Sequence, residues 1–156
     1  MISRRLLGGL AMAGLARPAG ATPGLSVFEM AEPSGEPGVA LRVFVYRPAA
    51  WRPADQAIIV LHGQGRDADR YIAQWAPQAE ATGLLVIAPE FSQRKYPGVA
   101  AYNWGNVVTE AGTPNPPEAW IFGAIDRIWA AAREKTGATQ AGYARFALNG
   151  SGAFAK

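Results

Sequence analysis

The sequence contains no cysteine and a single histidine, His62. Without cysteine it can form no disulfide framework, no thiolate metal site and no lipidated cysteine. It also lacks a basic stripe. Residues 1–21 hold three arginines and no acid, and the remainder has twelve basic against twelve acidic side chains, so the net charge of +3 belongs to the N-terminus. With a neutral remainder, we expect no nucleic-acid partner.

Long hydrophobic runs are missing as well. The most apolar segment, residues 6–16, has eleven residues with three glycines, too few to cross about 30 Å of hydrocarbon. The chain instead begins in the order of an export signal: Arg4-Arg5, this apolar run, and the small triplet Ala19-Gly20-Ala21. We therefore predict a signal peptide at residues 1–21, recognition by the export machinery, no stable membrane insertion, and a periplasmic or extracellular protein. Ser3-Arg4-Arg5-Leu6-Leu7 resembles a twin-arginine signal, which exports folded proteins.

Apolar patterns in residues 22–156 predict one domain of alternating strands and helices. Residues 57–61 and 84–88 are continuous apolar runs, as in strands covered on both faces of a parallel sheet. Further strands are expected at residues 25–30, 41–46 and 143–148. This order predicts an α/β fold with an open, mostly parallel sheet flanked by helices.

Two helices are expected between these strands. The first begins near Asp69, is kinked or restarted at Pro77, and ends at Gly83. The second begins after an Asn115 N-cap, with Pro116 at its first position and Glu118 completing a capping box, and it ends at Gly137. Its apolar stripe, which assigns both tryptophans to the core, comprises Trp120, Ile121, Ala124, Ile125, Ile128, Trp129 and Ala132.

His62-Gly63-Gln64-Gly65 follows the first continuous apolar run. In open α/β sheets, ligands bind at the carboxyl ends of the strands. Glycines there let the backbone turn sharply and present N–H groups, which a hydrolase needs where negative charge develops on the attacked carbonyl oxygen. The alternative is a glycine turn with a packed or capping histidine.

Ser151 lies between Gly150 and Gly152, directly after the last predicted strand. A strained strand-to-helix turn with small neighbours lifts a serine hydroxyl out of the sheet. The alternatives are a Gly/Ser turn that starts any helix, and a phosphate-binding turn. The spacing fits neither G-x-G-x-x-G nor a P-loop, which excludes the common nucleotide-binding motifs.

Taken together in this order, the motifs resemble the α/β-hydrolase family from about Leu41 to the C-terminus. Residues 59–65 look like its third strand and oxyanion loop, residues 84–91 like its fourth strand, and residues 143–153 like its fifth strand and nucleophile elbow. Within the family, the sequence is most similar to exported bacterial esterase or depolymerase-like members.

This resemblance implies a serine hydrolase acting on small or polymeric carboxylic esters through an acyl-enzyme, without metal or organic cofactor. Ser151 is the implied nucleophile. The backbone N–H groups of Gln64 and Gly152 are the implied oxyanion hole, supported by the loop residues His62, Gly63 and Gly65. Two positions depart from the family elbow G-x-S-x-G, because Asn149 and Ala153 stand where it has glycine.

The family's acid and histidine follow the serine, whereas the five residues after Ser151 contain neither. We therefore expect a partial domain at residues 22–156, truncated after the nucleophile elbow. The alternative function is a non-catalytic remnant or secreted binding module. Glu90 could border a pocket, and Asp126 is expected on a solvated helix face; neither replaces the acid.

Aromatic residues mark the long loop at residues 90–114. Loops of this length are often functional. Tyr102 and Trp104, with Tyr96, could line a substrate pocket, or they could cover the edge of the sheet.

Overall fold

The structure is a computed structural model, and it describes residues 23–147. The predicted signal peptide, and Ser151 with its neighbours Asn149, Gly152 and Ala153, lie outside these residues. Within the described range, no helix combines the length and apolar character needed to cross a bilayer.

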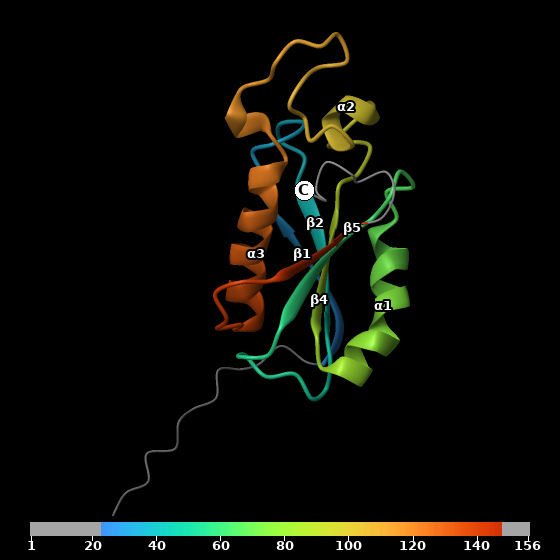
Figure 1. The fold of residues 1–156 in the computed structure, drawn as a ribbon, viewed down its shortest axis with the longest axis vertical. Helices are drawn as coiled ribbons and strands as arrows, with labels where there is room; N and C mark the ends of the chain where they lie inside the picture. Colours follow the sequence, from blue (N-terminus) through green and yellow to red (C-terminus); the bar gives the residue numbers. More distant parts are fainter. Residues whose placement is uncertain (1–22, 148–156) are drawn as a thin grey trace, which may run out of the picture.

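Five strands form one sheet in the order β1-β2-β4-β3-β5 (Figure 1). They are β1 (Gly24–Met30), β2 (Leu41–Arg47), β3 (Ala57–Leu61), β4 (Leu85–Glu90) and β5 (Ala144–Ala147). The pairs β3–β4 and β3–β5 are parallel, whereas β1–β2 and β2–β4 are antiparallel, so the sheet is mixed. Strands alternate with helices along the chain, so the predicted α/β class with helices flanking the sheet is confirmed.

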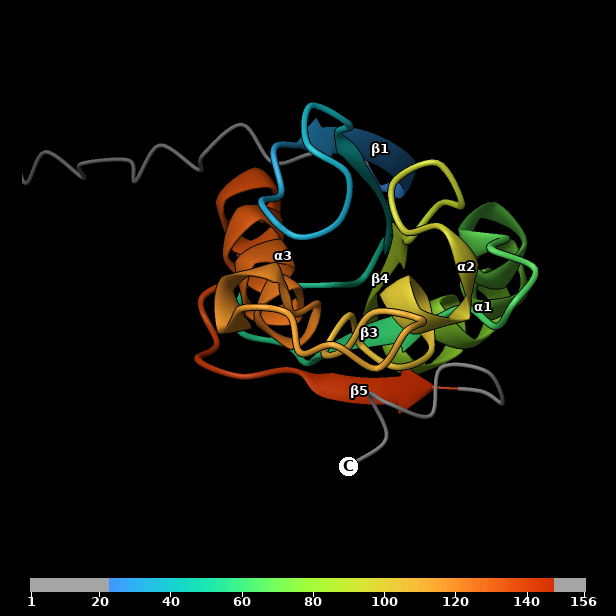
Figure 2. The same ribbon diagram turned by 90° about the horizontal axis from the view of Figure 1, so that it is seen from above.

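Helices cover both faces of the sheet, as Figure 2 shows from above. Helix α1 (Ala68–Thr82) covers one face and α3 (Phe122–Thr136) covers the other. Successive side chains of β3 explain its continuous apolar run: Ile59 and Leu61 belong to the core on the α3 face, and Val60 to the core on the α1 face.

The predicted helix ends are confirmed. Gly83 and Gly137 both adopt left-handed conformations, with φ of 73° and 77°, and close α1 and α3. Helix α1 continues through Pro77, so this proline does not start a second helix.

The predicted start of α3 is wrong. Its first residue is Phe122, and its N-cap position is Ile121 without a side-chain cap. Pro116 is extended, with φ −63° and ψ 147°, because it precedes Pro117 and a residue before proline is excluded from the helical region. The short 3₁₀ helix η1 (Pro117–Ala119) and an extended Trp120 lie between Pro116 and α3.

The long loop carries structure of its own, since residues 98–102 form helix α2 (Gly98–Tyr102). Figure 1 places α2 and the segment that leads to α3 above the same end of the sheet. Trp120, predicted in the core, is half-buried, and its indole Nε1 donates to the Asn115 carbonyl at 2.9 Å. Trp129 lies in the core as predicted, 5% exposed.

Candidate functional site

A tight turn follows β3 at the carboxyl end of the parallel strands. The Arg66 N–H donates to the Gly63 carbonyl at 3.2 Å and closes the turn. Gln64 and Gly65 lie exposed at its tip. Among residues 23–147, no acceptor receives the N–H of Gln64. The tip therefore has an unused backbone donor at the carboxyl end of the strands, where α/β sheets bind ligands.

His62 is fully buried beneath this turn. Its Nε2 accepts the backbone N–H of Phe91 at 2.9 Å, so Nε2 carries no proton. The proton of the neutral ring is then on Nδ1, which donates to the Gly63 carbonyl at 2.9 Å. Burial lowers the pKa of His62. Both ring nitrogens are engaged, which leaves no free nitrogen to act as a base toward a nucleophile.

Arg66, at the other end of the turn, also forms hydrogen bonds with the backbone of neighbouring segments. The residue is 8% exposed, and its guanidinium carbon Cζ lies 4.1 Å from the centre of the Tyr102 ring. Nη1 donates to the Phe91 carbonyl at 2.5 Å, and Nη2 donates to the Gly98 carbonyl at 3.0 Å. Burial lowers the pKa of Arg66.

Tyr102 supports the turn from below. It is fully buried, and its hydroxyl donates to the His62 carbonyl at 2.5 Å. Its ring packs 5.0 Å from His62 and 5.4 Å from Phe91, measured between centroids. Tyr102 is therefore part of the core in this structure and does not line an open pocket. Trp104 is 49% exposed and is the loop aromatic that can still meet a ligand.

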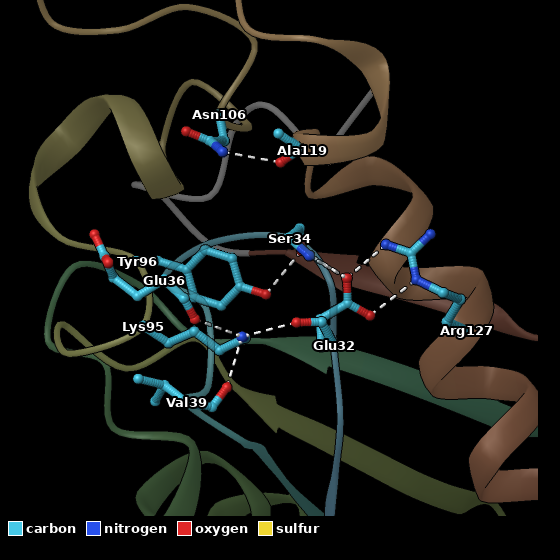
Figure 3. Close-up of polar contacts among 9 residues, drawn as sticks. All are labelled: Glu32, Ser34, Glu36, Val39, Lys95, Tyr96, Asn106, Ala119 and Arg127. Atoms are coloured by element: carbon cyan, nitrogen blue, oxygen red, sulfur yellow. Dashed lines mark hydrogen bonds and ion pairs between the residues drawn. The ribbon is translucent and has the colours of Figure 1, made fainter.

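A buried polar cluster lies at the same end of the molecule, between the β1–β2 loop, the loop after β4, and α3 (Figure 3). It consists of Glu32, Ser34, Lys95, Tyr96 and Arg127, and the sequence analysis missed it. Arg127 donates from Nε and Nη2 to the two carboxylate oxygens of Glu32, at 2.9 and 2.5 Å. Ser34 donates its N–H and hydroxyl to the same carboxylate, at 3.0 and 2.7 Å, and its hydroxyl lies 3.0 Å from the Tyr96 hydroxyl.

Lys95 anchors the β1–β2 loop. It is fully buried, and its Nζ donates to the carbonyls of Glu32, Glu36 and Val39, at 2.9, 3.3 and 2.7 Å. All three donors of the ammonium are thus used. In return, the Glu36 N–H donates to the Lys95 carbonyl at 2.7 Å. The ten residues of the β1–β2 loop, 31–40, are therefore held by a single ammonium group (Figure 3).

The pKa values in this cluster follow from burial and pairing. Burial raises the pKa of Glu32, but its bonds from Arg127 and Ser34 outweigh this and lower the value below 4.5 overall. Burial lowers the pKa of Lys95, and it raises that of the Tyr96 hydroxyl. The Glu32 bond raises the pKa of Arg127. The cluster therefore holds one ion pair, Glu32–Arg127, and an ammonium group bonded to three carbonyls, and it is a structural anchor.

The two acids considered from the sequence are engaged elsewhere. Glu90 accepts both Nε and Nη2 of Arg42, its cross-strand partner, at 2.8 and 2.7 Å. Asp126 lies on the exposed face of α3, as predicted, and accepts the Tyr143 hydroxyl at 2.7 Å.

The strands that precede the two predicted loops are neighbours. In the parallel pair β3–β5, Leu61 is registered with Ala147. Neighbouring strands lie about 4.8 Å apart. The carboxyl ends of β3 and β5 therefore lie side by side, at the same level of the sheet.

Solved structures share this architecture. Poly(aspartic acid) hydrolase-1 from Sphingomonas sp. KT-1 is 33% identical, with a TM-score of 0.76 over 86% of this chain and 50% of that one. A poly(3-hydroxybutyrate) depolymerase from Bordetella parapertussis is 28% identical, with a TM-score of 0.75 over 85% of this chain and 45% of that one. An acetyl xylan esterase from Aspergillus awamori shares the fold, with a TM-score of 0.53 at 14% identity.

These structural neighbours are α/β-hydrolases of esterase and depolymerase type, and the chain spans about half the length of each. No protein-family model matches the sequence, and no curated protein sequence matches it.

Proposed function

We propose that the protein is a serine hydrolase that cleaves carboxylic esters, with Ser151 as nucleophile. The hydroxyl would attack the ester carbonyl, the alcohol would leave, and water would release the acid from the acyl-enzyme. Support comes from two hydrolase neighbours of 33% and 28% identity, with TM-scores of 0.76 and 0.75.

The observation that carries the proposal is the meeting of two strand ends. Gln64 follows Leu61 of β3 by three residues, and Ser151 follows Ala147 of β5 by four, while Leu61 and Ala147 are partners in the sheet. Acyl transfer requires a nucleophile and an N–H donor close to each other. We propose that the segments after these two neighbouring strand ends supply them. We propose the N–H groups of Gln64 and Gly152 as the oxyanion hole. The Gln64 N–H, which has no acceptor among residues 23–147, supports the first of these.

The substrate would be a small ester or a polyester. One neighbour acts on poly(3-hydroxybutyrate), a polyester, and the other on poly(aspartic acid), a polyamide, according to their names. Trp104, half-exposed above the sheet edge, is the residue we propose to meet the acyl or alcohol part. His62 is not the base that activates Ser151, because Phe91 and Gly63 occupy its two nitrogens.

The test compares wild type with Ser151→Ala on p-nitrophenyl acetate and butyrate, together with labelling by a fluorophosphonate probe. Both the chain alone and the complete product of its gene are assayed. We expect turnover and labelling that depend on Ser151 in at least one of the two. Equal turnover in wild type and variant, with no labelling in either form, would refute the proposal.

Export is proposed on the sequence of residues 1–21 alone. Replacing Arg4-Arg5 by two lysines should abolish export of a folded fluorescent reporter fused after residue 21. Continued export of that fusion would argue against a twin-arginine signal.

A further inference from the structure

The proposed chemistry makes no use of Arg66, although its surroundings are unusual. The guanidinium is buried, and no carboxylate among residues 23–147 forms an ion pair with it. Its Nε is buried without a hydrogen-bond partner in the same range. The Arg66 backbone is left-handed, with φ of 55°, which is uncommon outside glycine, asparagine and aspartate. A buried unpaired charge and a strained backbone are both unfavourable, and strain of this kind clusters at functional positions.

The hydrogen bonds of Arg66 explain what the side chain holds. Together with His62, it holds the backbone of one residue on both sides: His62 Nε2 accepts the Phe91 N–H, and Arg66 Nη1 donates to the carbonyl of Phe91, in the next peptide unit. Phe91 directly follows β4, so the turn after β3 is fixed to the end of the neighbouring strand.

The second guanidinium nitrogen reaches further. Nη2 donates to the carbonyl of Gly98, the first residue of α2, and the ring of Tyr102, the last residue of α2, lies under the guanidinium. One side chain thus connects the turn, the end of β4 and both ends of α2. A lysine would place a single Nζ where arginine has two separated Nη donors, and it would lose the planar group that lies over the Tyr102 ring.

We propose that Arg66 is a positioning residue, which fixes the turn at residues 62–66, and with it the Gln64 N–H, relative to β4 and α2. This inference rests on the proposed function, since it concerns the residue that holds the proposed oxyanion donor, the Gln64 N–H, in place. Arg66 does not touch the reacting atoms; it acts through the backbone of its own turn.

Arg70 provides a matched control. It lies four residues further on, near the same turn, over the ring of Tyr71, but it is largely exposed, and its ion-pair partner among residues 23–147 is Asp67, at 2.6 Å. Arg66→Met, Arg66→Lys and Arg70→Met are therefore compared with wild type in the form of the protein that shows Ser151-dependent turnover.

For Arg66→Met we expect kcat on p-nitrophenyl butyrate to fall about 10- to 100-fold, since a displaced oxyanion donor costs rate in that range. KM should stay within about twofold, and the inhibition constant of a phenylboronic acid, which mimics the tetrahedral intermediate, should rise with the loss of kcat. Arg66→Lys should lie between the two, and Arg70→Met should match wild type. A purely structural role would lower the melting temperature and the number of labelled active sites, but not kcat per labelled site.

Backbone hydrogen exchange gives a second readout that is independent of catalysis. Arg66→Met should speed exchange at residues 62–66 and 91–98, and Arg70→Met should not. Wild-type kcat per labelled site in a folded Arg66 variant, or unchanged exchange, would overturn the inference. If Arg66→Met does not fold, Arg66→Lys decides it. Absence of Ser151-dependent turnover in wild type would instead refute the proposed function, and the exchange data would still test the role of Arg66.

Discussion

Two arginine–glutamate pairs with the same fork geometry allow the effect of burial to be measured on its own. In each pair, Nε and Nη2 of the arginine reach the two carboxylate oxygens at 2.5–2.9 Å. The Glu32 side chain is 0% exposed, whereas that of Glu90 is 19% exposed. Arg127→Met and Arg42→Met remove the same donors from the two sites.

The structure sets the expected magnitudes. Without Arg42, the Glu90 carboxylate is rehydrated, and exposed pairs are worth about 0–1 kcal/mol. Without Arg127, Glu32 remains a buried carboxylate held by Ser34, and breaking a buried pair costs about 3–5 kcal/mol. The nearby Lys95 ammonium compensates part of the charge, so we expect about 3 kcal/mol. That is a large share of the ~5–15 kcal/mol that stabilises a typical domain, and at ~2–4 °C per kcal/mol it lowers Tm by roughly 6–12 °C.

The assay is urea denaturation followed by circular dichroism, with Glu32→Gln and Glu90→Gln completing a double-mutant cycle for each pair. The coupling energy should exceed about 2 kcal/mol for Glu32–Arg127 and stay below about 1 kcal/mol for Glu90–Arg42. Equal couplings would refute the reasoning from burial. The pH dependence gives a further check. Removing Arg127 raises the folded-state pKa of Glu32 relative to wild type, so the folded variant binds more protons and the cost of Arg127→Met must shrink as the pH falls through 4.5.

Three further outcomes are expected. His62 is neutral when folded and has an ordinary pKa of 6.5 when unfolded, so the free energy of unfolding should be constant above pH 6.5 and fall by about 1.4 kcal/mol per pH unit below it, until the folded-state pKa is reached. Because the sequence has one histidine, His62→Gln should flatten this slope below pH 6.5, and an unchanged slope would contradict a neutral, buried His62 in the folded state. Gly35→Ala should cost at least about 2 kcal/mol in urea denaturation, because φ is +73° and the new Cβ would lie 2.5 Å from the Lys95 carbonyl oxygen. Gly38→Ala has the same φ with open space around it, so equal costs at the two positions would mean that the steric contact is unimportant. Tyr102→Phe should lower the free energy of unfolding by about 1–3 kcal/mol, since the buried His62 carbonyl loses its donor, and a stability equal to wild type would show that another group satisfies it.

Local signals in the sequence were sufficient for most of the sheet. Strand β3 is apolar at every position because both faces are covered, and Gly83 and Gly137 mark helix ends because they alone adopt positive φ there without strain. The same local reasoning failed at α3, where a good N-cap and a first-turn proline were present. Pro117, one residue later, forced Pro116 out of the helical region and delayed the helix to Phe122.

The support of the site could not be predicted in this way. The polar sequence around Lys95 indicates a solvated charge, yet one of its hydrogen-bond partners, the Glu32 carbonyl, lies 63 residues earlier in the chain. Arg127 pairs with Glu32 across 95 residues. Tyr102 reads as an exposed loop aromatic, whereas helix α2 turns it under His62. Such contacts depend on the tertiary arrangement, and neither periodicity nor composition records them.

The lysine-centred loop also constrains the order in which the chain can assemble. Strands β1 and β2 are adjacent in sequence and can pair early, but the loop between them is held by Lys95 and Arg127, which are synthesised much later. Closing contacts over such separations is entropically costly and slows folding. The loop that connects β1 and β2 therefore stays unanchored until β4 and α3 have formed. The loop residues 31–40, although made early, can therefore be anchored only late in folding.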